Sequence, residues 1–189
     1  MKNICFFSFI FITIFISCQS KMENNIVKST IPVHLNDLDV VIIDTALGND
    51  FQNIDFENLP RMTKALYDSL QISKIAYLQD YDTTYLSMGR ILLSNDNGRI
   101  ITIQVISDGE IMEYLISYNS SGQLVDNMLV AYEDMVEYYS EISSKIQSNN
   151  IIVQTVNFIY EDEQGNPIET SDTLLTKYQI SSEFKFIPL

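Results

Sequence analysis

The chain has 189 residues, a formal net charge of −14 and no tryptophan. An excess of acidic side chains this large repels phosphate backbones, so the composition argues against nucleic acid as a partner. Only four alanines accompany 11 tyrosines and 10 phenylalanines, and this balance favours strands over helices.

The N-terminal segment begins with a positive charge at Lys2 and continues with an apolar stretch over 4–16. This stretch is shorter than the roughly 20 apolar residues that a membrane-spanning helix needs. Its length suits the apolar core of a secretory signal peptide, and it has no polar face with which to lie on a globular surface. We therefore predict a signal peptide at 1–17.

The apolar stretch ends in Phe15, Ile16, Ser17 and Cys18, which resembles the lipobox of bacterial lipoproteins. Ser17 and Cys18 are the most specific part of this match, and Phe15 departs from the usual leucine. The resemblance implies cleavage before Cys18, with diacylglycerol on the sulfur and a third acyl chain on the amine. Such an anchor is stable, because each buried methylene contributes about 0.8 kcal/mol.

The other cysteine, Cys5, lies in the predicted signal peptide, so the mature chain would carry no free thiol. Disulfides, thiolate nucleophiles and cysteine-ligated metals are then not expected. The single histidine, His34, lies in the polar segment after Cys18, which argues against an imidazole base or metal cluster. We predict no cofactor, no metal and no catalytic residue.

Residues 18–36 are polar and lack apolar periodicity. We predict a lipidated N-terminus and tether there, spanning about 25 Å as a flexible coil, and a single β-rich domain over 37–189. Surface-displayed lipoproteins of the Bacteroidota often carry an acidic cluster after the lipidated cysteine, whereas this chain has Glu23 beside Lys21. The predicted location is the outer membrane, facing the periplasm, with surface display as the alternative.

The domain begins with an apolar run at 39–45 that predicts a short buried strand. A helix is predicted at 59–71, with Asn58 as its cap and Pro60 in its first turn. Its apolar stripe, at spacings of three and four residues, consists of Leu59, Met62, Leu66 and Leu70.

From residue 77 onward, apolar or alternating runs are separated by turn sequences rich in Asn, Asp, Ser and Gly. Turns this short connect antiparallel neighbours. We predict a mainly β fold, a meander of seven or eight strands with one helix, forming a curved sheet, a partly closed barrel or a sandwich. The strands are expected at about 84–94, 99–106, 111–118, 123–132, 150–160, 172–180 and 183–187.

Residues 133–147 fit both helical and alternating patterns. A helix would stack Glu133, Glu137 and Glu141 on one face, where like charges repel. We therefore predict a strand at 138–147.

Alternation within the strands predicts which side chains face the core. Glu113 and Ser117 are predicted to face solvent. The strands at 99–106 and 150–160 are apolar on both sides, so both of their faces should be covered, by the helix, by a second sheet or by closure. The predicted core faces are Met112, Tyr114, Ile116 and Tyr118 in one strand and Leu174, Tyr178 and Ile180 in another.

The chain from residue 86 to its end is similar to a broad group of uncharacterised, flavobacterial-type lipoproteins of the Bacteroidota. The similarity rests on the sequence Tyr-Asn-Ser-Ser-Gly-Gln-Leu-Val-Asp at 118–126 and on shorter matches at 143–146 and 177–180. It implies an outer-membrane or periplasmic lipoprotein, and it implies no particular activity.

Three groups of acidic residues could carry chemistry. Paired carboxylates hydrolyse glycosides when they are about 5–9 Å apart across a cleft, and clustered carboxylates bind calcium. Solvated turns explain the same groups, and the calcium-like turn at 96–98 lacks the downstream glutamate, since Ile103 stands there. The groups are Asp80 with Asp82, Glu133 with Asp134 and Glu137, and Glu161 with Asp162 and Glu163.

The tyrosines could form a platform that stacks on sugar rings, but most share a strand face with aliphatic residues. We therefore predict that Tyr114, Tyr118, Tyr132 and Tyr178 pack in the core. Of the adjacent pair Tyr138 and Tyr139, one is expected to be exposed.

The anchor, the acidic surface and the missing catalytic motifs favour a non-catalytic binding or scaffold module of the cell envelope. Its partners would be the lipid bilayer, through acylated Cys18, and an envelope protein. Two alternatives remain: a small carboxylate-dependent hydrolase that acts on glycans, and an inhibitor of a basic hydrolase such as lysozyme.

Overall fold

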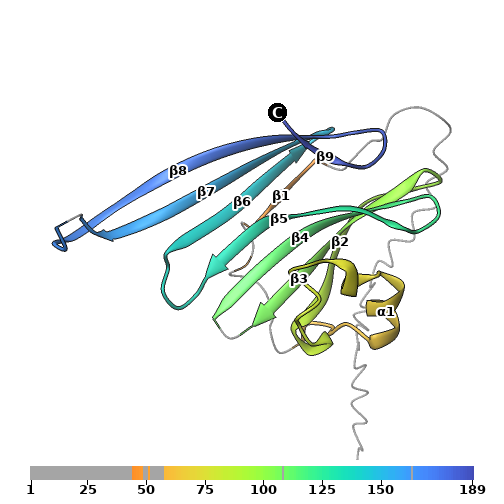
Figure 1. The fold of residues 1–189 in the computed structure, drawn as a ribbon, viewed down its shortest axis with the longest axis horizontal. Coiled ribbons are helices and arrows are strands. Elements are labelled where there is room, and N and C mark those ends of the chain that lie inside the picture. The colour runs from red at the N-terminus through yellow and green to blue at the C-terminus, as the bar shows by residue number, and fades with distance from the viewer. Residues whose placement is uncertain (1–43, 49–50, 52–57, 108, 163) are drawn as a thin grey trace, which may run out of the picture. The chain divides into compact units, whose positions relative to one another are not determined.

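The computed structural model describes residues 44–48, 51, 58–107, 109–162 and 164–189. All of them belong to one compact unit that spans His34–Leu189. Their main feature is an antiparallel sheet in which consecutive strands are neighbours, so the chain runs as a meander (Figure 1). The strands are β1 (Thr45–Leu47), β2 (Leu86–Asn95), β3 (Gly98–Ser107), β4 (Glu110–Asn119), β5 (Leu124–Asp134), β6 (Ser140–Gln147), β7 (Asn150–Glu161), β8 (Pro167–Ile180) and β9 (Phe186–Pro188).

This architecture confirms the predicted fold class, a mainly β antiparallel meander with one short helix. The described residues form nine strands, against the seven or eight predicted, and the sheet is not closed into a barrel. The segment at 138–147 is a strand, β6, although it begins two residues later than predicted. Most of the apolar run predicted as a strand at 39–45 lies outside the described residues, and β1 begins at its last residue, Thr45.

The helix begins later than predicted. The segment that includes Met62 is extended, because the Met62 N–H donates to the Leu86 carbonyl at 2.8 Å at the start of β2. Helix α1 (Lys64–Ser69) therefore begins after Thr63, whose hydroxyl accepts a hydrogen bond from the Leu66 N–H at 3.2 Å. Two 3-10 helices, η2 (Ile72–Lys74) and η3 (Thr83–Tyr85), continue the chain to β2.

The helical segment covers one face of β2–β4 (Figure 1). On that face, Ile103 and Tyr114 pack among residues of the helical segment, such as Leu70 at the end of α1 and Ile72 in η2. The strand face predicted from 111–118 is confirmed here, because its four residues are all buried in this cluster: Met112, Tyr114, Ile116 and Tyr118.

The opposite face of β2–β5 is covered by the second half of the sheet. Strands β5 and β6 pair at only two positions, Tyr132 with Ile142 and Glu133 with Glu141, so the sheet bends there. Further along β6, β1 pairs with residues 144–146. Leu115 from β4 consequently shares a core cluster with Ile151 from β7.

This second core explains an incorrect prediction. Glu113 and Ser117 were expected to face solvent, but both are fully buried. They lie on the face of β4 that the second half of the sheet covers, as Leu115 between them shows. Alternation identifies the two faces of a strand, but it cannot show that a second layer covers the polar one.

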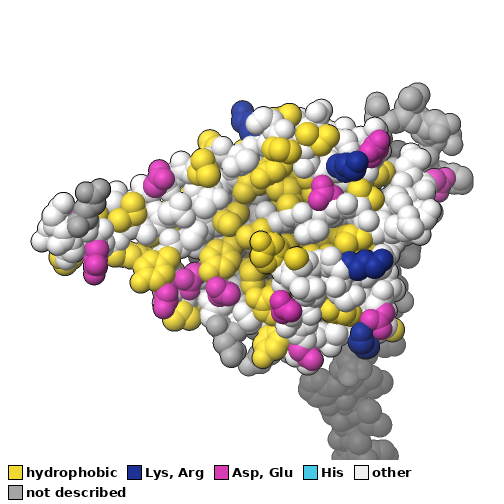
Figure 2. All heavy atoms as spheres, in the orientation of Figure 1, with side chains coloured by type: hydrophobic (Ala, Val, Ile, Leu, Met, Phe, Trp, Pro, Cys, Tyr) yellow, Lys and Arg dark blue, Asp and Glu magenta, His cyan; other side chains and the backbone are white. Residues whose placement is uncertain are grey.

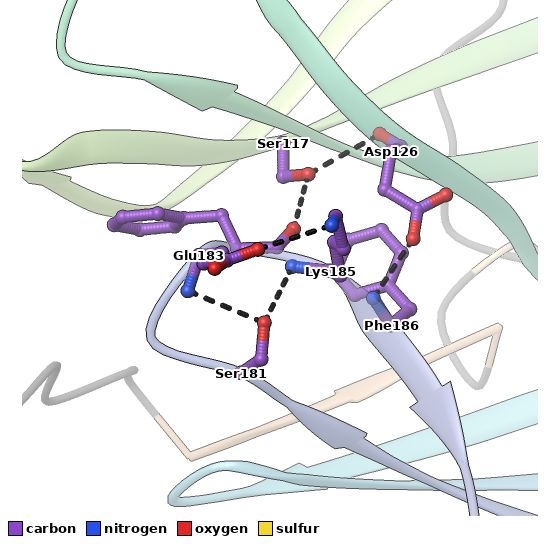
Figure 3. A network of polar contacts seen from close by, with 7 residues as sticks. Ser117, Asp126, Ser181, Glu183, Lys185 and Phe186 are labelled. Carbon is purple, nitrogen blue, oxygen red and sulfur yellow. Dashed lines mark hydrogen bonds and ion pairs between the residues drawn. The ribbon is translucent and has the colours of Figure 1, made fainter.

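The loop that joins β8 to β9 connects the two halves of the sheet (Figure 3). The Ser117 hydroxyl donates to the Phe184 carbonyl at 2.7 Å. The Phe186 N–H donates to the Asp126 carboxylate at 2.8 Å. Within the loop, the Ser181 hydroxyl accepts hydrogen bonds from the N–H groups of Glu183 and Lys185, at 3.2 and 3.0 Å.

The outer part of β7 and β8 forms an exposed arm that extends beyond the other strands (Figure 1). Ile151 and Val153 of β7 are buried, but most of β7 after Val153 and all of 164–175 are half-buried or exposed. Leu174, predicted to face the core, is 59% exposed. The prediction that 150–160 is covered on both faces is therefore wrong for its outer half, because among the described residues no second layer extends over it.

Candidate functional site: an acidic and aromatic cleft

The connection between β5 and β6 is built around Asp134. Its carboxylate accepts hydrogen bonds from the N–H groups of Val136 and Glu137, both at 2.9 Å. These bonds stabilise the charged form and lower the pKa of Asp134. Near the end of the connection, Tyr138 has a φ of 55°, a conformation that residues with a Cβ adopt at a cost.

Aromatic side chains gather where this connection meets the β7–β8 arm. The Tyr160 hydroxyl donates to the Tyr138 carbonyl at 3.0 Å, and the rings of Tyr139 and Tyr160 lie 6.1 Å apart. The Phe158 N–H donates to the Tyr139 carbonyl at 2.9 Å, extending the β6–β7 pairing. Tyr138 and Tyr139 are both more than half exposed, because the positive φ ends the strand alternation that would place them on opposite faces.

These elements enclose a cleft of about 560 Å³. Figure 2 shows acidic side chains gathered beside hydrophobic ones where the arm meets the rest of the sheet. None of the described residues that line the cleft is basic. The lining consists of Gly48, Glu133, Asp134, Tyr138, Ser140, Glu141, Phe158, Tyr160, Glu169 and Thr170.

Two carboxylates of the cleft repel each other. Glu133 in β5 lies directly opposite Glu141 in β6 in the strand register. Burial, and then the charge of Glu141, raise the pKa of Glu133 above its usual value. Like charges directly opposite one another destabilise a sheet, so this pair costs the fold free energy.

The acidic groups predicted from sequence serve mainly to hold turns. Asp82 accepts from the Thr84 N–H at 2.9 Å at the start of η3, which lowers its pKa. Asp162 accepts from the N–H groups of Gln164 and Asn166 in the β7–β8 turn, and the hydrogen bonds from Asn166 lower its pKa most. Asp80 is exposed, whereas Glu163 lies outside the described residues.

Of the four tyrosines predicted to pack in the core, Tyr114 and Tyr118 are buried there, whereas Tyr132 and Tyr178 are partly buried against it. The Tyr118 hydroxyl donates to the Leu70 carbonyl at 2.6 Å, and burial raises the pKa of Tyr118 to about 12. Tyr114 is buried, and burial raises its pKa to about 12 as well. Tyr178 packs partly buried against the second core. Tyr132 is also half-buried, and its hydroxyl donates to Glu110 at 2.9 Å.

The described residues contain no group of three or more His, Cys, Asp or Glu side chains placed to hold a metal ion. In the turn at 95–98, which resembles part of a calcium loop, the side chain of Asn95 accepts from the N–H groups of Asn97 and Gly98. Cys18, the predicted tether at 18–36 and His34 lie outside the described residues.

Some of the residues at the cleft were singled out from the sequence alone. Glu133, Asp134 and the pair Tyr138 and Tyr139 were noted, but Phe158, Tyr160 and Glu169 were not associated with them. The available signal was the period-two spacing of Phe158 and Tyr160 in a strand. It could not show that their strand passes beside the β5–β6 connection.

No protein-family model, no curated protein and no solved structure matches the chain. Within the part of the chain that the structure describes, no helix is both long and apolar enough to cross a membrane.

Proposed function

We propose that the chain is a cell-envelope lipoprotein, anchored through acylated Cys18, whose β domain binds a basic segment of a partner protein. The observation that carries this proposal is the cleft, in which four carboxylates and three aromatic rings come together without a described basic residue. The carboxylates are Glu133, Asp134, Glu141 and Glu169, and the rings belong to Tyr138, Phe158 and Tyr160.

A lysine or arginine side chain fits this chemistry at both of its ends. Its aliphatic stem packs on aromatic rings, while its charged head attracts carboxylates and the faces of those rings. A cation would also relieve the repulsion between Glu133 and Glu141, because each carboxylate would gain an opposite charge. The net charge of the whole chain, −14, would accelerate encounter with a basic partner.

The binding test uses lysozyme as a basic probe protein, with the dissociation constant measured by calorimetry. Glu141→Gln is expected to weaken binding about 3-fold to 10-fold, and binding should weaken further as salt is raised, because attraction between exposed charges is screened. Asp68→Asn is the matched control, since it removes one exposed acid on α1, outside the cleft. Equal losses for both variants, or binding that is unchanged at high salt, would overturn the proposed site.

Glu133→Gln separates binding from stability. The raised folded pKa means that ionised Glu133 costs stability at pH 7, a cost that disappears as the pH falls through that pKa. The free energy of unfolding of the variant should therefore be about 0.5 kcal/mol higher than that of the unsubstituted protein at pH 7 and unchanged near pH 4. The variant should nevertheless bind lysozyme less tightly. A variant that loses stability at pH 7 would contradict this interpretation.

The glycan-directed hydrolase is a second candidate, because one carboxyl of a close pair in an aromatic cleft has a raised pKa. Glycosidases use such an asymmetry to divide the roles of acid and base. Assay of the protein on a panel of glycans distinguishes the candidates. Turnover that is abolished by Glu133→Gln would favour the hydrolase, and the absence of turnover would favour the binding module.

The proposed anchor has its own test. Cys18→Ser is expected to move the protein from the membrane fraction to the soluble fraction and to abolish labelling with radioactive palmitate, because no acyl chain can be attached. Cys5→Ser, which changes a cysteine of the predicted signal peptide, is the matched control and should leave both unchanged. Membrane retention and labelling of the Cys18→Ser protein would exclude the anchor.

A further inference from the structure

Along most of the outer edge of β8, the backbone N–H and C=O groups are not paired with any described strand. β8 pairs with β7 along one edge, whereas β9 covers its other edge only at Tyr178–Ile180. The Lys177 carbonyl faces this outer edge, because it accepts from the Leu189 N–H at 2.9 Å. Since backbone groups alternate in direction along a strand, those of Glu169, Ser171, Thr173 and Leu175 face the same edge.

The exposed stretch at 167–175 has a symmetric pattern. Apolar residues stand at both of its ends, Pro167 and Ile168 at one and Leu174 and Leu175 at the other, with polar residues between them. Ile168, Leu174 and Leu175 are 37%, 59% and 59% exposed. A two-stranded arm that is exposed on both faces is only marginally stable, and an exposed apolar edge strand tends to pair with another strand.

We infer that the occupant of this edge is a second copy of the chain, paired antiparallel through β8 with Ser171 opposite Ser171. This register places Leu174 and Leu175 of each copy opposite Ile168 and Pro167 of the other. Glu169 then lies opposite Thr173, and Asp172 opposite Thr170, so no charge faces a like charge directly. Glu169, Ser171 and Thr173 of the two copies form about six backbone hydrogen bonds.

The neighbouring registers are worse. Pairing centred on Asp172 would place two carboxylates directly opposite each other. Pairing centred on Thr173 would place Glu169 of the second copy opposite Lys177, a position that Leu189 already occupies. Pairing centred on Thr170 would bring Thr173 opposite Pro167, which has no N–H to donate, so about four backbone hydrogen bonds would form between residues that each have an N–H, against about six in the Ser171 register. The β7–β8 pairing is irregular between Ile159 and Glu161, whose partners in β8 are Thr170 and Pro167. The proposed hydrogen bonds therefore all lie in the regular part of β8, after Ile168.

A disulfide at the symmetry axis tests this register in the full chain with Cys5 and Cys18 replaced by Ser. Ser171→Cys is expected to give a covalent dimer on mild oxidation, because directly opposite Cα atoms lie about 5.5 Å apart. Thr173→Cys is the matched control, because Thr173 is also exposed and lies on the same strand face. Its counterpart in the second copy would be four residues along the strand, about 13 Å away, so it should not cross-link.

Light scattering on the same background, without the new cysteine, should give about twice the 21.7 kDa mass of the full chain at micromolar concentration. Thr173→Pro should return it to the monomer, because it removes an edge-facing N–H without removing a β7–β8 hydrogen bond. A monomer before substitution, or equal cross-linking at positions 171 and 173, would overturn the inference. Glu169 and Thr170 belong to both the cleft and the proposed pairing, but positions 171 and 173 lie outside the cleft lining, so cross-linking and mass test the dimer while lysozyme binding tests the proposed function.

Discussion

Gly98→Ala is expected to lower the free energy of unfolding by about 3 kcal/mol. Gly98 begins β3 next to β4, and a Cβ there would lie 2.3 Å from the Tyr118 carbonyl oxygen and 3.0 Å from the Phe184 ring. The carbonyl belongs to the backbone of a central strand, so it cannot move aside without disturbing the β3–β4 pairing. Urea denaturation of the two proteins measures the difference.

Gly122→Ala is the control for this prediction. Gly122 has a φ of 72°, so alanine is strained there, but no atom lies within 4 Å of its added Cβ. Its loss should be about 1 kcal/mol, from the backbone conformation alone. Similar losses at the two glycines would show that close approach to β4 is not what Gly98 provides.

Asp126→Ala is expected to cost about 2 kcal/mol, because it leaves the Phe186 N–H without its carboxylate acceptor. The same carboxylate also accepts from the Asn127 N–H at 2.8 Å, so one substitution removes two hydrogen bonds. The loss should appear in the free energy of unfolding and in faster hydrogen exchange of the Phe186 amide.

Asp126→Asn is the control, because it keeps the shape of the side chain and one acceptor oxygen. The amide oxygen can still accept from Phe186, so less than half of the alanine effect is expected. A double-mutant cycle with Ser117→Ala measures coupling, since the Ser117 hydroxyl donates to the Phe184 carbonyl in the same loop at 2.7 Å and its oxygen also lies 3.3 Å from the Asp126 carbonyl oxygen. Strictly additive effects would contradict a shared role of the two residues in joining the halves of the sheet.

Local patterns were enough to predict the hairpins. Asn95 and Asn119 hold their turns through hydrogen bonds to nearby N–H groups, so the sequence of each turn determines its geometry. The start of α1 was misplaced because Met62 pairs with Leu86, a contact between residues far apart in the sequence. Pro60 and Asn58 are compatible with a helix start, but the strand pairing overrides that local preference.

The burial of individual side chains was harder to predict. Glu113 is enclosed and Leu174 is exposed, against expectation in both cases. Each depends on how far the second half of the sheet extends over the first, and that extent is set by the bend between β5 and β6. The part of the cleft that β7 and β8 contribute is missed for the same reason, since Glu133 and Tyr160 line one cleft only because of how the strands bend.

The short strand β1 has a consequence for folding. Every other strand pairs with a neighbour in the sequence, whereas Thr45 pairs with Ile146, about a hundred residues away. Arg90 of β2 also holds β1, donating to the Thr45 hydroxyl at 3.0 Å and the Ala46 carbonyl at 2.9 Å. Closing so long a loop is entropically costly until the hairpins have formed, so we expect β1 to dock last. Folding then ends with a strand from the N-terminal side of the domain, which closes the gap that the meander leaves between its two halves.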